Sequence, residues 1–430
     1  MIEYKETDIQ WLGSIPSSWE LKKIKYVLRE RIEKNNPVRT SFILSLTAKQ
    51  GVIPYDEKEG GGNKPKEDVS AYRLAYPGDI VMNSMNILSG SVGLSNYFGC
   101  VSPVYYMLRP KDEADDVRYF NYIFQTTMFQ RSLFGLGNGI LIKESGNGKL
   151  NTIRMRIPMD KFGGLYIPIA PQDVQHAISD FLDGKCAEID SLISNIQREI
   201  DTLEAYKKSV ISESVTKGLN LNVEVKDSGI FYMGPINSQW GISKIGYTCT
   251  KLSRNFQTED AAVVCSNKGK VMLRDENATG KMVSEDNAMQ GIRKGDIAIH
   301  GMDTWHGAIA LSDLDGKITR VVHVCDSSED KRYIVYYMQY LAFQGVYKLI
   351  SNGVRGNTSD FRSWDKVKDI YIPLPSRSEQ EKICNYLDDV CHEVDLALEK
   401  KQEQLDILET YKKTVIYEYV TGKKEVPVNA

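Results

Sequence analysis

Apolar residues recur in two long stretches with the four-then-three spacing of a coiled-coil seam. The first stretch contains Leu182, Cys186, Ile189, Ile193, Ile196, Ile200, Leu203 and Val210. The second contains Leu387, Cys391, Val394, Leu398, Leu405, Leu408 and Val415, and Lys401 interrupts it. A helix of about 38 residues would be about 57 Å long. Neither helix can bury its apolar stripe alone, so we expect the two to pack against each other.

These stretches lie in two copies of one segment. The segment that begins at Ile167 aligns without a gap with the segment that begins at Ile372. Roughly twenty of about fifty positions are identical, which is the signature of an internal repeat. Gln175 matches Gln380, and both copies carry the tripeptide Tyr-Lys-Lys near their ends.

The segments before each copy repeat more faintly and have a mixed pattern. Residues 76–86 resemble residues 293–303 and share Gly-Asp-Ile. Short strand-like runs alternate with Gly/Asn turns, whereas residues 119–134 and 333–350 have one apolar face and read as helices. The predicted fold class is α+β. It has two globular mixed α/β domains separated by two long helices that form an antiparallel coiled coil, as a pseudo-twofold tandem repeat.

The repeat divides the chain into four parts. The boundaries that it predicts are residues 1–166, 167–220, 221–371 and 372–430. The two helical segments are more alike than the two globular segments. This contrast favours two related but different ligands and one type of partner that binds twice. A duplicated scaffold without such a functional division remains the alternative.

Composition and charge place the chain among ordinary globular proteins. It has 430 residues, 42% of them hydrophobic, and a net charge of −3. The globular segments carry the positive excess and the helical segments are acidic, so a local patch could still face phosphates. The seven cysteines form no Cys-x-x-Cys pair and the amino terminus is polar. We therefore expect a cytoplasmic protein with reduced cysteines and no membrane span.

The sequence lacks the motifs of the enzyme classes that act on nucleic acids. The nearest phosphate-loop candidate, Gly146-Asn-Gly-Lys149, is followed by Leu150 where Ser or Thr is needed. No Pro-Pro occurs, which excludes the usual amino-methyltransferase tetrapeptide, and Asp56-Glu57-Lys58 is too compact for a nuclease centre. The cluster Asp303-Thr-Trp-His306 favours base contact or loop packing over a metal site. We expect no catalytic residue and no metal site.

Several of these motifs resemble one known family. They are Ile372-Pro-Leu-Pro with Ser378-Glu-Gln-Glu-Lys-Ile383, the run from Tyr411 to Gly422, and the Gly-Asp-Ile boxes at Gly78 and Gly295. In order and content they are similar to the specificity subunits of type I restriction-modification enzymes. The first helical copy departs slightly, because Lys217-Gly218 replaces Gly-Lys and no Glu precedes Gln175.

The resemblance implies a non-catalytic DNA-specificity subunit of a phage-defence complex. Each globular domain would be a target-recognition domain that reads a few base pairs. The helices would act as a spacer, so that the double-stranded target is bipartite and asymmetric. Two methyltransferase subunits would dock on the helices and methylate adenine, and two motor-nuclease subunits would cleave unmodified DNA. AdoMet, ATP and Mg²⁺ would belong to those partners, and this chain would hold no cofactor.

Candidate DNA-binding residues are polar or basic side chains in the loops after the Gly-Asp-Ile boxes and in Gly/Asn-rich loops. They are Lys64, Lys66, Arg73, Asn83, Ser84, Asn86, Lys143, Arg154, Arg274, Lys281, His300, Asp303, Trp305, Arg355 and Arg362. Candidate spacer and methyltransferase-docking residues lie on the helical copies. They are Leu182, Ile189, Ile196, Leu203, Tyr206, Lys207, Leu387, Val394, Leu408, Tyr411 and Lys412.

Two other functions compete with this interpretation. A fused nuclease-methyltransferase is disfavoured by the missing cofactor and metal motifs. A coiled-coil adaptor without a DNA role is disfavoured by the ordered duplication around the Gly-Asp-Ile boxes.

Overall fold

The structure is a computed structural model that describes most of the chain. The described residues are 3–48, 50–58, 64–137, 142–144, 150–152, 156–220, 222–274, 288–351 and 361–427. They fall into two compact units. The first unit is Met1–Ile196 with Gln404–Ala430, and the second is Gln197–Glu403. Each unit therefore contains one globular domain and a part of both long helices.

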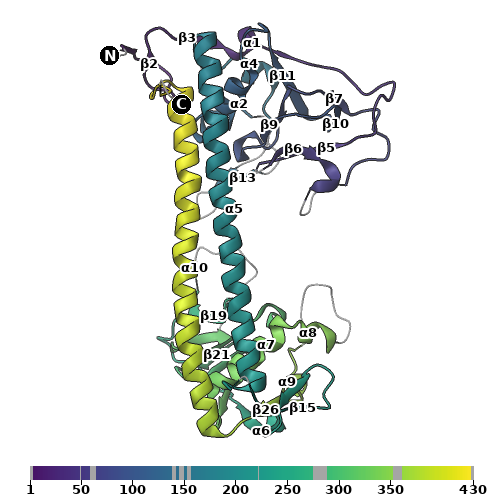
Figure 1. Cartoon of the computed structure of the whole chain (residues 1–430), viewed down its shortest axis with the longest axis vertical. Helices are drawn as coiled ribbons and strands as arrows, with labels where there is room; N and C mark the ends of the chain where they lie inside the picture. Colours follow the sequence, from purple (N-terminus) through teal and green to yellow (C-terminus); the bar gives the residue numbers. More distant parts are fainter. Residues whose placement is uncertain are drawn as a thin grey trace. The chain divides into compact units, whose positions relative to one another are not determined.

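The two long helices are α5 (Gln172–Lys217) and α10 (Arg377–Val420), drawn in teal and yellow in Figure 1. In the first unit Lys412 of α10 pairs with Asp190 of α5 at 2.7 Å. In the second unit Lys401 pairs with Glu199, and Lys207 pairs with Asp395, both at 2.6 Å. In the first unit Phe181 of α5 also lies against Tyr419 of α10. In the second unit the partners on α10 run back from Lys401 to Asp395 as α5 advances from Glu199 to Lys207. The helices are therefore antiparallel within each unit.

Each domain is built on a four-stranded antiparallel sheet. In domain 1, which precedes α5, the order is β4 (Leu28–Glu30), β11 (Tyr105–Pro110), β8 (Ile80–Asn83) and β9 (Val92–Leu94). In domain 2, between α5 and α10, it is β18 (Cys249–Lys251), β25 (Val322–Ser327), β22 (Ile297–His300) and β23 (Ile309–Leu311). The two sheets have the same topology.

Two-stranded antiparallel ribbons accompany these sheets, and four of them follow the same order in both domains, whereas the β12–β13 ribbon is described in domain 1 alone. Domain 1 pairs β1 (Tyr4–Lys5) with β2 (Ile15–Pro16), β3 (Glu20–Lys23) with β14 (Tyr166–Ile169), β5 (Leu44–Thr47) with β6 (Gly51–Pro54), β7 (Arg73–Ala75) with β10 (Gly99–Val101), and β12 (Ile142–Glu144) with β13 (Leu150–Thr152). Domain 2 pairs β15 (Val225–Asp227) with β16 (Pro235–Asn237), β17 (Gly241–Lys244) with β26 (Tyr371–Leu374), β19 (Val263–Cys265) with β20 (Val271–Leu273), and β21 (Met289–Ile292) with β24 (Gly316–Thr319).

The short helices also correspond between the domains, apart from η1, which is described in domain 1 alone. Domain 1 has α1 (Ile24–Val27), η1 (Tyr55–Glu57), η2 (Ile87–Ser89), α2 (Val117–Gln125), α3 (Thr127–Ser132) and α4 (Met159–Gly163). Domain 2 has α6 (Ile245–Thr248), η4 (Thr304–His306), α7 (Lys331–Phe343), α8 (Val346–Leu349) and α9 (Trp364–Lys368). The predicted α+β fold class, with two mixed domains and long paired helices, is confirmed.

Each predicted helix of the globular domains is interrupted once. Residues 119–134 divide into α2 and α3 at Thr126, whose side chain caps α3 by accepting from the Phe129 amide. Residues 333–350 divide into α7 and α8 at Gly345, whose φ of +69° ends a right-handed helix. The apolar periodicity continues across both breaks, which is why the sequence pattern did not reveal them.

Each long helix contributes to the core of a domain. In the first unit Leu182 and Cys186 of α5 and Val420 of α10 belong to the same buried cluster as Phe120 of α2. In the second unit Val215 of α5 and Leu387 of α10 are buried with Tyr337 of α7. Each domain is thus joined to the start of one long helix and the end of the other.

Candidate functional site: domain-to-helix junctions and candidate binding loops

The same local motif begins the main helix of each domain. The sequence Asp116-Val-Arg-Tyr-Phe-Asn-Tyr122 starts α2, and Asp330-Lys-Arg-Tyr-Ile-Val-Tyr336 starts α7. Both aspartates are N-caps, because each side chain accepts a hydrogen bond from the backbone amide two residues later. The shared pattern is Asp-x-Arg-Tyr-x-x-Tyr, and its side chains face the long helix that follows the domain.

The motif arginine links its own N-cap aspartate to the long helix. Arg118 lies 2.6 Å from Asp116, 2.8 Å from Asp180 and 2.7 Å from Asp183. The hydrogen bonds from Arg118 lower the pKa of Asp116, although burial acts strongly in the opposite direction. A guanidinium with several fixed donors suits such a three-sided arrangement of acceptors.

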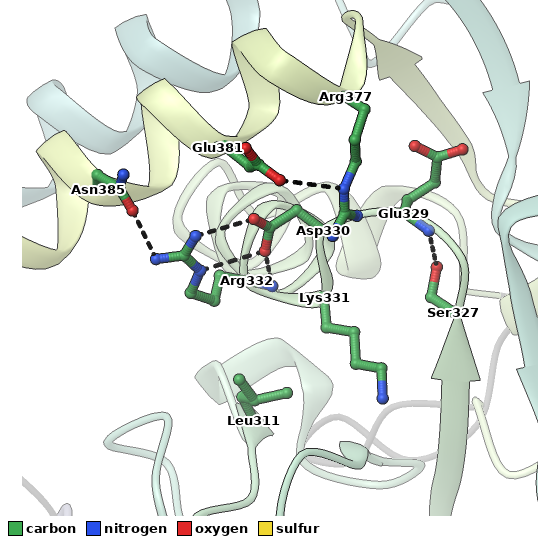
Figure 2. Close-up of a pocket in the computed structure, with 9 residues that line it drawn as sticks. All are labelled: Leu311, Ser327, Glu329, Asp330, Lys331, Arg332, Arg377, Glu381 and Asn385. Atoms are coloured by element: carbon green, nitrogen blue, oxygen red, sulfur yellow. Dashed lines mark hydrogen bonds and ion pairs between the residues drawn. The ribbon is translucent and has the colours of Figure 1, made fainter.

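The second domain repeats this arrangement. Arg332 lies 2.9 Å from Asp330, 2.9 Å from the Asn385 side-chain oxygen and 2.7 Å from Asp388. Figure 2 shows Arg332 between Asp330 and Asn385, at the edge of an open pocket of about 540 Å³ that Arg377 and Glu381 also line. Asn385 stands where the first unit has Asp180, so the second junction has one carboxylate fewer.

The last motif tyrosine bonds to the same helix aspartate as the arginine. The Tyr122 hydroxyl donates to Asp183 at 2.6 Å, and the Tyr336 hydroxyl donates to Asp388 at 2.6 Å. Burial, and then the bond to the carboxylate, raises the pKa of both tyrosines, so the hydroxyls stay protonated and remain donors. Each helix aspartate therefore accepts one bond from an arginine and one from a tyrosine.

The first motif tyrosine is buried and reaches both long helical segments. The Tyr119 hydroxyl lies 3.2 Å from the carbonyl oxygens of Pro168 and Val420. The Tyr333 hydroxyl lies 3.0 Å from the Pro373 carbonyl and 3.3 Å from the Val215 carbonyl. Each contact joins the domain to the entry of one helix and the end of the other.

A buried glutamine near the start of each long helix completes the junction. The Gln175 oxygen accepts from the Asp116 amide at 3.1 Å, and its nitrogen donates to Asp115 at 3.1 Å and to the Ala170 carbonyl at 2.9 Å. Gln380 makes the equivalent bonds with Asp330, Glu329 and Pro375, at 2.9, 2.8 and 3.0 Å. Both glutamines are 0% exposed. Each side-chain nitrogen donates two hydrogen bonds and each oxygen accepts one, so an ionised acid at either position would lose both donated bonds.

Our sequence reasoning noted that Gln175 matches Gln380 but missed the Asp-x-Arg-Tyr-x-x-Tyr motif. The signal was present, because the two motifs lie at corresponding places in otherwise dissimilar domains. Its residues begin helices, whereas the predicted DNA-binding residues belong to loops.

The Gly-Asp-Ile boxes form structural turns. Asp79 has a 0% exposed side chain that accepts from the Tyr76 amide and lies within 3.2 Å of Arg31 and 3.1 Å of Arg109. Asp296 accepts from the Arg293 amide at 2.8 Å and pairs with Arg254 at 2.5 Å. Burial raises the pKa of Asp79 even beside the two arginines. These boxes brace the start of β8 and β22.

The first residues after the boxes differ from what we predicted. Asn83 and Ser84 are buried, at 8% and 1% exposure, and the Ser84 hydroxyl donates to the Val104 carbonyl at 2.7 Å. Asn83 accepts from the Met85 amide at 3.0 Å, and His300 accepts from the Met302 and Asp303 amides at the equivalent turn. Burial lowers the pKa of His300, which keeps that nitrogen free to accept. The side chains of Asn83, Ser84 and His300 hold the turn rather than face solvent.

The next residues of these loops point outward. Asn86 is exposed, and the side chain of Asp303 is 41% exposed at the equivalent position. The Trp305 ring is half-buried: its nitrogen donates to the Ser351 hydroxyl at 3.2 Å, and Lys348 lies over its face. Asn86, Asp303 and Trp305 thus remain candidates for DNA contact on geometric grounds.

The predicted basic residues have different surroundings. Arg73 is paired with Glu30 at 2.6 Å and is mostly covered, so it braces β7 against β4. Lys64, Lys66 and Arg362 are exposed, and Arg274 is half-buried. Arg154, Lys281, Arg355 and the side chain of Lys143 lie outside the described residues.

The predicted docking residues of the long helices divide into two groups. Leu182, Ile189, Leu387 and Val394 are buried, at 0 to 6% exposure, while Ile196, Leu203 and Leu408 are half-buried. Lys207 and Lys412 form the ion pairs between the helices described above. These residues therefore hold the chain together and leave little surface for a partner. Tyr206 and Tyr411, at 50% and 46% exposure, occupy equivalent positions and do face outward.

The remaining chemistry is sparse in the part of the chain that the structure describes. Within it, no group of three His, Cys, Asp or Glu side chains could hold a metal ion. All seven cysteines are buried and unpaired. Among the described helices, none is long and apolar enough to cross a bilayer.

Comparison with curated proteins shows which proteins share this organisation. The chain is 22% identical to a Methanocaldococcus jannaschii protein assigned to the MjaX type I restriction enzyme as its specificity subunit, over 98% of this chain and 97% of that protein. It is 25% identical to the MjaVIII specificity subunit of the same organism, over 62% of this chain and 63% of that subunit. The resemblance to type I specificity subunits is confirmed.

Solved structures agree at the level of the fold. One chain, from a study of complex assembly and conformational transition in a type I restriction-modification system, has a TM-score of 0.65 with 12% identity. The match covers 95% of this chain and 99% of that chain. No family model matches the sequence.

Proposed function

We propose that this chain is the DNA-specificity subunit of a type I restriction-modification complex. It would bind a bipartite, asymmetric double-stranded target and direct partner subunits to methylate adenine or to cleave unmodified DNA. The observation that carries the proposal is that two domains of the same topology, each fixed to a long helix by the same contacts, differ in their loops. Two domains that share a framework but differ in their loops are suited to bind two half-sites of different sequence.

Loops that read base edges and phosphates supply the DNA contacts in this proposal. Asn86 and Asp303 are the leading candidates for base contact, because they occupy equivalent exposed positions after the Gly-Asp-Ile turns. Lys64, Lys66 and Arg362 are exposed cations suited to phosphates or to guanine. Arg154, Lys281, Arg355 and Lys143 remain predictions from the sequence.

Two methyltransferase subunits would dock on the paired helices, and two motor-nuclease subunits would join them. Tyr206 and Tyr411 support this part of the proposal, because exposed tyrosines at repeat-related positions fit one partner that binds twice. The chain itself would be non-catalytic. AdoMet, ATP and Mg²⁺ would then be held by the partners.

The partner assignment predicts an effect of the exposed tyrosines. Replacing Tyr206 and Tyr411 with alanine should weaken co-purification with the methyltransferase roughly tenfold or more, as loss of buried aromatic anchors does. The melting temperature of the isolated chain should hardly change. Phe231→Ala is the matched control, since Phe231 is 80% exposed on domain 2. An unchanged yield of complex would remove these tyrosines from the docking surface.

The decisive test of the function is a map of N6-methyladenine in cells that express the methyltransferase with and without this chain. We expect a split motif with two unlike halves that disappears without the chain. If methylation is unaffected by the chain, or if the chain methylates DNA alone, the proposal is wrong.

A further inference from the structure

The two Asp-x-Arg-Tyr-x-x-Tyr junctions do more than add stability. We define latch 1 as Arg118, Tyr122 and Gln175 with Asp183, and latch 2 as Arg332, Tyr336 and Gln380 with Asp388. We propose that the latches are positioning devices which hold each recognition domain at one angle on its long helix and so fix the length of the unread gap in the target. This inference rests on the proposed function.

The latch contacts were retained as a set in both domains. The two domains have diverged in sequence, yet the arginine, both tyrosines, the glutamine and the helix aspartate are the same in both. Apolar packing around them is already extensive, because Phe120, Ile178 and Leu182 are fully buried beside latch 1. Apolar contacts are non-directional and would tolerate small rotations. A fixed angle between a domain and its long helix therefore requires directional hydrogen bonds at fixed positions.

Each latch has a geometry that permits little rotation. In latch 1, Asp183 accepts from Arg118 at 2.7 Å and from Tyr122 at 2.6 Å, while Gln175, about two helical turns earlier on α5, makes three bonds. Charge-assisted bonds are short and strongly directional. Two bonded points separated along one helix leave only rotation about the line that joins them, and the Tyr119 hydroxyl, which bonds to the Pro168 and Val420 carbonyls, supplies a third point.

A change in the angle between a domain and its long helix would shift the loops that contact DNA. A domain of about 150 residues has its far loops on the order of 20 Å from the junction. A rotation of roughly 10° would then move those loops by about 3.5 Å, which is close to the rise of one base pair. Loss of angular control at either latch would therefore appear as an error of one base pair in the gap, with the half-site sequences unchanged.

The latches differ in one charge, which yields an asymmetric expectation. Arg118 faces Asp180 and Asp183, whereas Arg332 faces Asn385 and Asp388. Removing the tyrosine hydroxyl should therefore loosen latch 2 more than latch 1.

The test uses the full chain assembled with its methyltransferase and a set of duplexes. All duplexes carry the two native half-sites, and the gap varies by one or two base pairs around the native length. Tyr122→Phe and Tyr336→Phe remove one hydroxyl each and keep the ring, so packing is retained. Arg118→Ala and Arg332→Ala remove the central cation. Tyr26→Phe, on an exposed ring outside both latches, is the control.

The wild-type complex and Tyr26→Phe should methylate one gap length. The latch variants should raise methylation at neighbouring gaps, relative to the native gap, by roughly tenfold, the effect of losing one charge-assisted bond. A double variant Tyr122→Phe/Asp183→Ala should resemble the Asp183→Ala single variant, because Asp183→Ala already removes the acceptor of the Tyr122 hydroxyl.

Other outcomes would overturn the inference. If latch variants lose activity by one factor at every gap length, or keep a single gap, the latches only stabilise the fold. If the wild-type complex itself shows no dependence on two half-sites, the proposed function fails, and the inference falls with it. The two failures are distinguished by the wild-type reaction alone.

Discussion

The buried glutamines stabilise the junctions through their side-chain amide nitrogen, which a glutamate lacks. Gln175 and Gln380 each donate two bonds and accept one inside the junction. A glutamate of the same shape cannot donate, and it would place a carboxylate beside Asp115 or Glu329. A buried group that loses its partner costs about 1–3 kcal/mol.

Gln175→Glu should therefore lower the free energy of unfolding by roughly 1–3 kcal/mol. Gln404→Glu is the matched control, because Gln404 is exposed on the other long helix. Urea unfolding at neutral pH measures both. Equal stability of the two variants would show that the carboxamide network is not important.

His300 makes one turn of domain 2 sensitive to pH. Burial lowers its pKa from the usual 6.5, so the folded state favours the neutral ring that accepts from Met302 and Asp303. The unfolded chain takes up a proton first as the pH falls. The stability that this group contributes is therefore complete above about pH 6.5 and declines below it, by at most about 1.4 kcal/mol per pH unit.

Domain 1 has Asn83 at the position equivalent to His300. The Asn83 side chain accepts from a backbone amide of the same turn and does not titrate, so asparagine is the matched substitution for His300. His300→Asn should fold, and its melting temperature should fall less between pH 7.5 and 5.5 than that of the wild-type chain. His323 is also buried with a lowered pKa and will retain part of the dependence. Identical pH profiles would exclude His300 as a contributor.

At the scale of elements, the long helices were the most predictable part of the chain. Their apolar spacing is local in sequence, and a repeat strengthens it, so both helices were expected from the pattern alone. The ion pairs Lys207–Asp395 and Asp190–Lys412 are copies of each other and follow the same logic. The sheets were less predictable, because their strands pair across long separations, as β4 does with β11.

The loops after the Gly-Asp-Ile boxes show where prediction from residue type fails. Asn83 and Ser84 have side chains that could read bases, but Asn83 accepts from the Met85 amide of its own turn and Ser84 donates to the Val104 carbonyl. Polar residues in a loop serve either the loop or a ligand, and only the fold distinguishes the two. Asn86, three residues further along, is the one that turns outward.

The paired lysines and aspartates predict a charge-swap rescue. Lys207→Asp should lower the free energy of unfolding by about 0.5–1 kcal/mol, because it places two carboxylates together in a partly exposed site. The double variant Lys207→Asp/Asp395→Lys should recover most of that loss. Thermal unfolding of the wild-type chain, Lys207→Asp, Asp395→Lys and the double variant gives the coupling energy between the two side chains. A double variant no better than the single would mean that the pair does not help to hold the helix register.

At the scale of the whole molecule, the account predicts that the two domains read DNA independently. Asn86→Ala should relax one position in one half-site, and Asp303→Ala should relax one position in the other, each by roughly 1–3 kcal/mol of discrimination. Methylation mapping with each variant shows which half changes. If both variants alter the same half-site, the assignment of one domain to each half is wrong.

The central claim is that two domains on one helical frame read a split sequence, and selection from random DNA tests it most directly. The chain, assembled with its methyltransferase, would be used to enrich duplexes from a fully randomised pool, followed by sequencing. We expect two short conserved blocks of different sequence at one fixed separation, with no base preference at the positions that lie between the blocks. One contiguous block, or no enrichment above that of the methyltransferase alone, would contradict it.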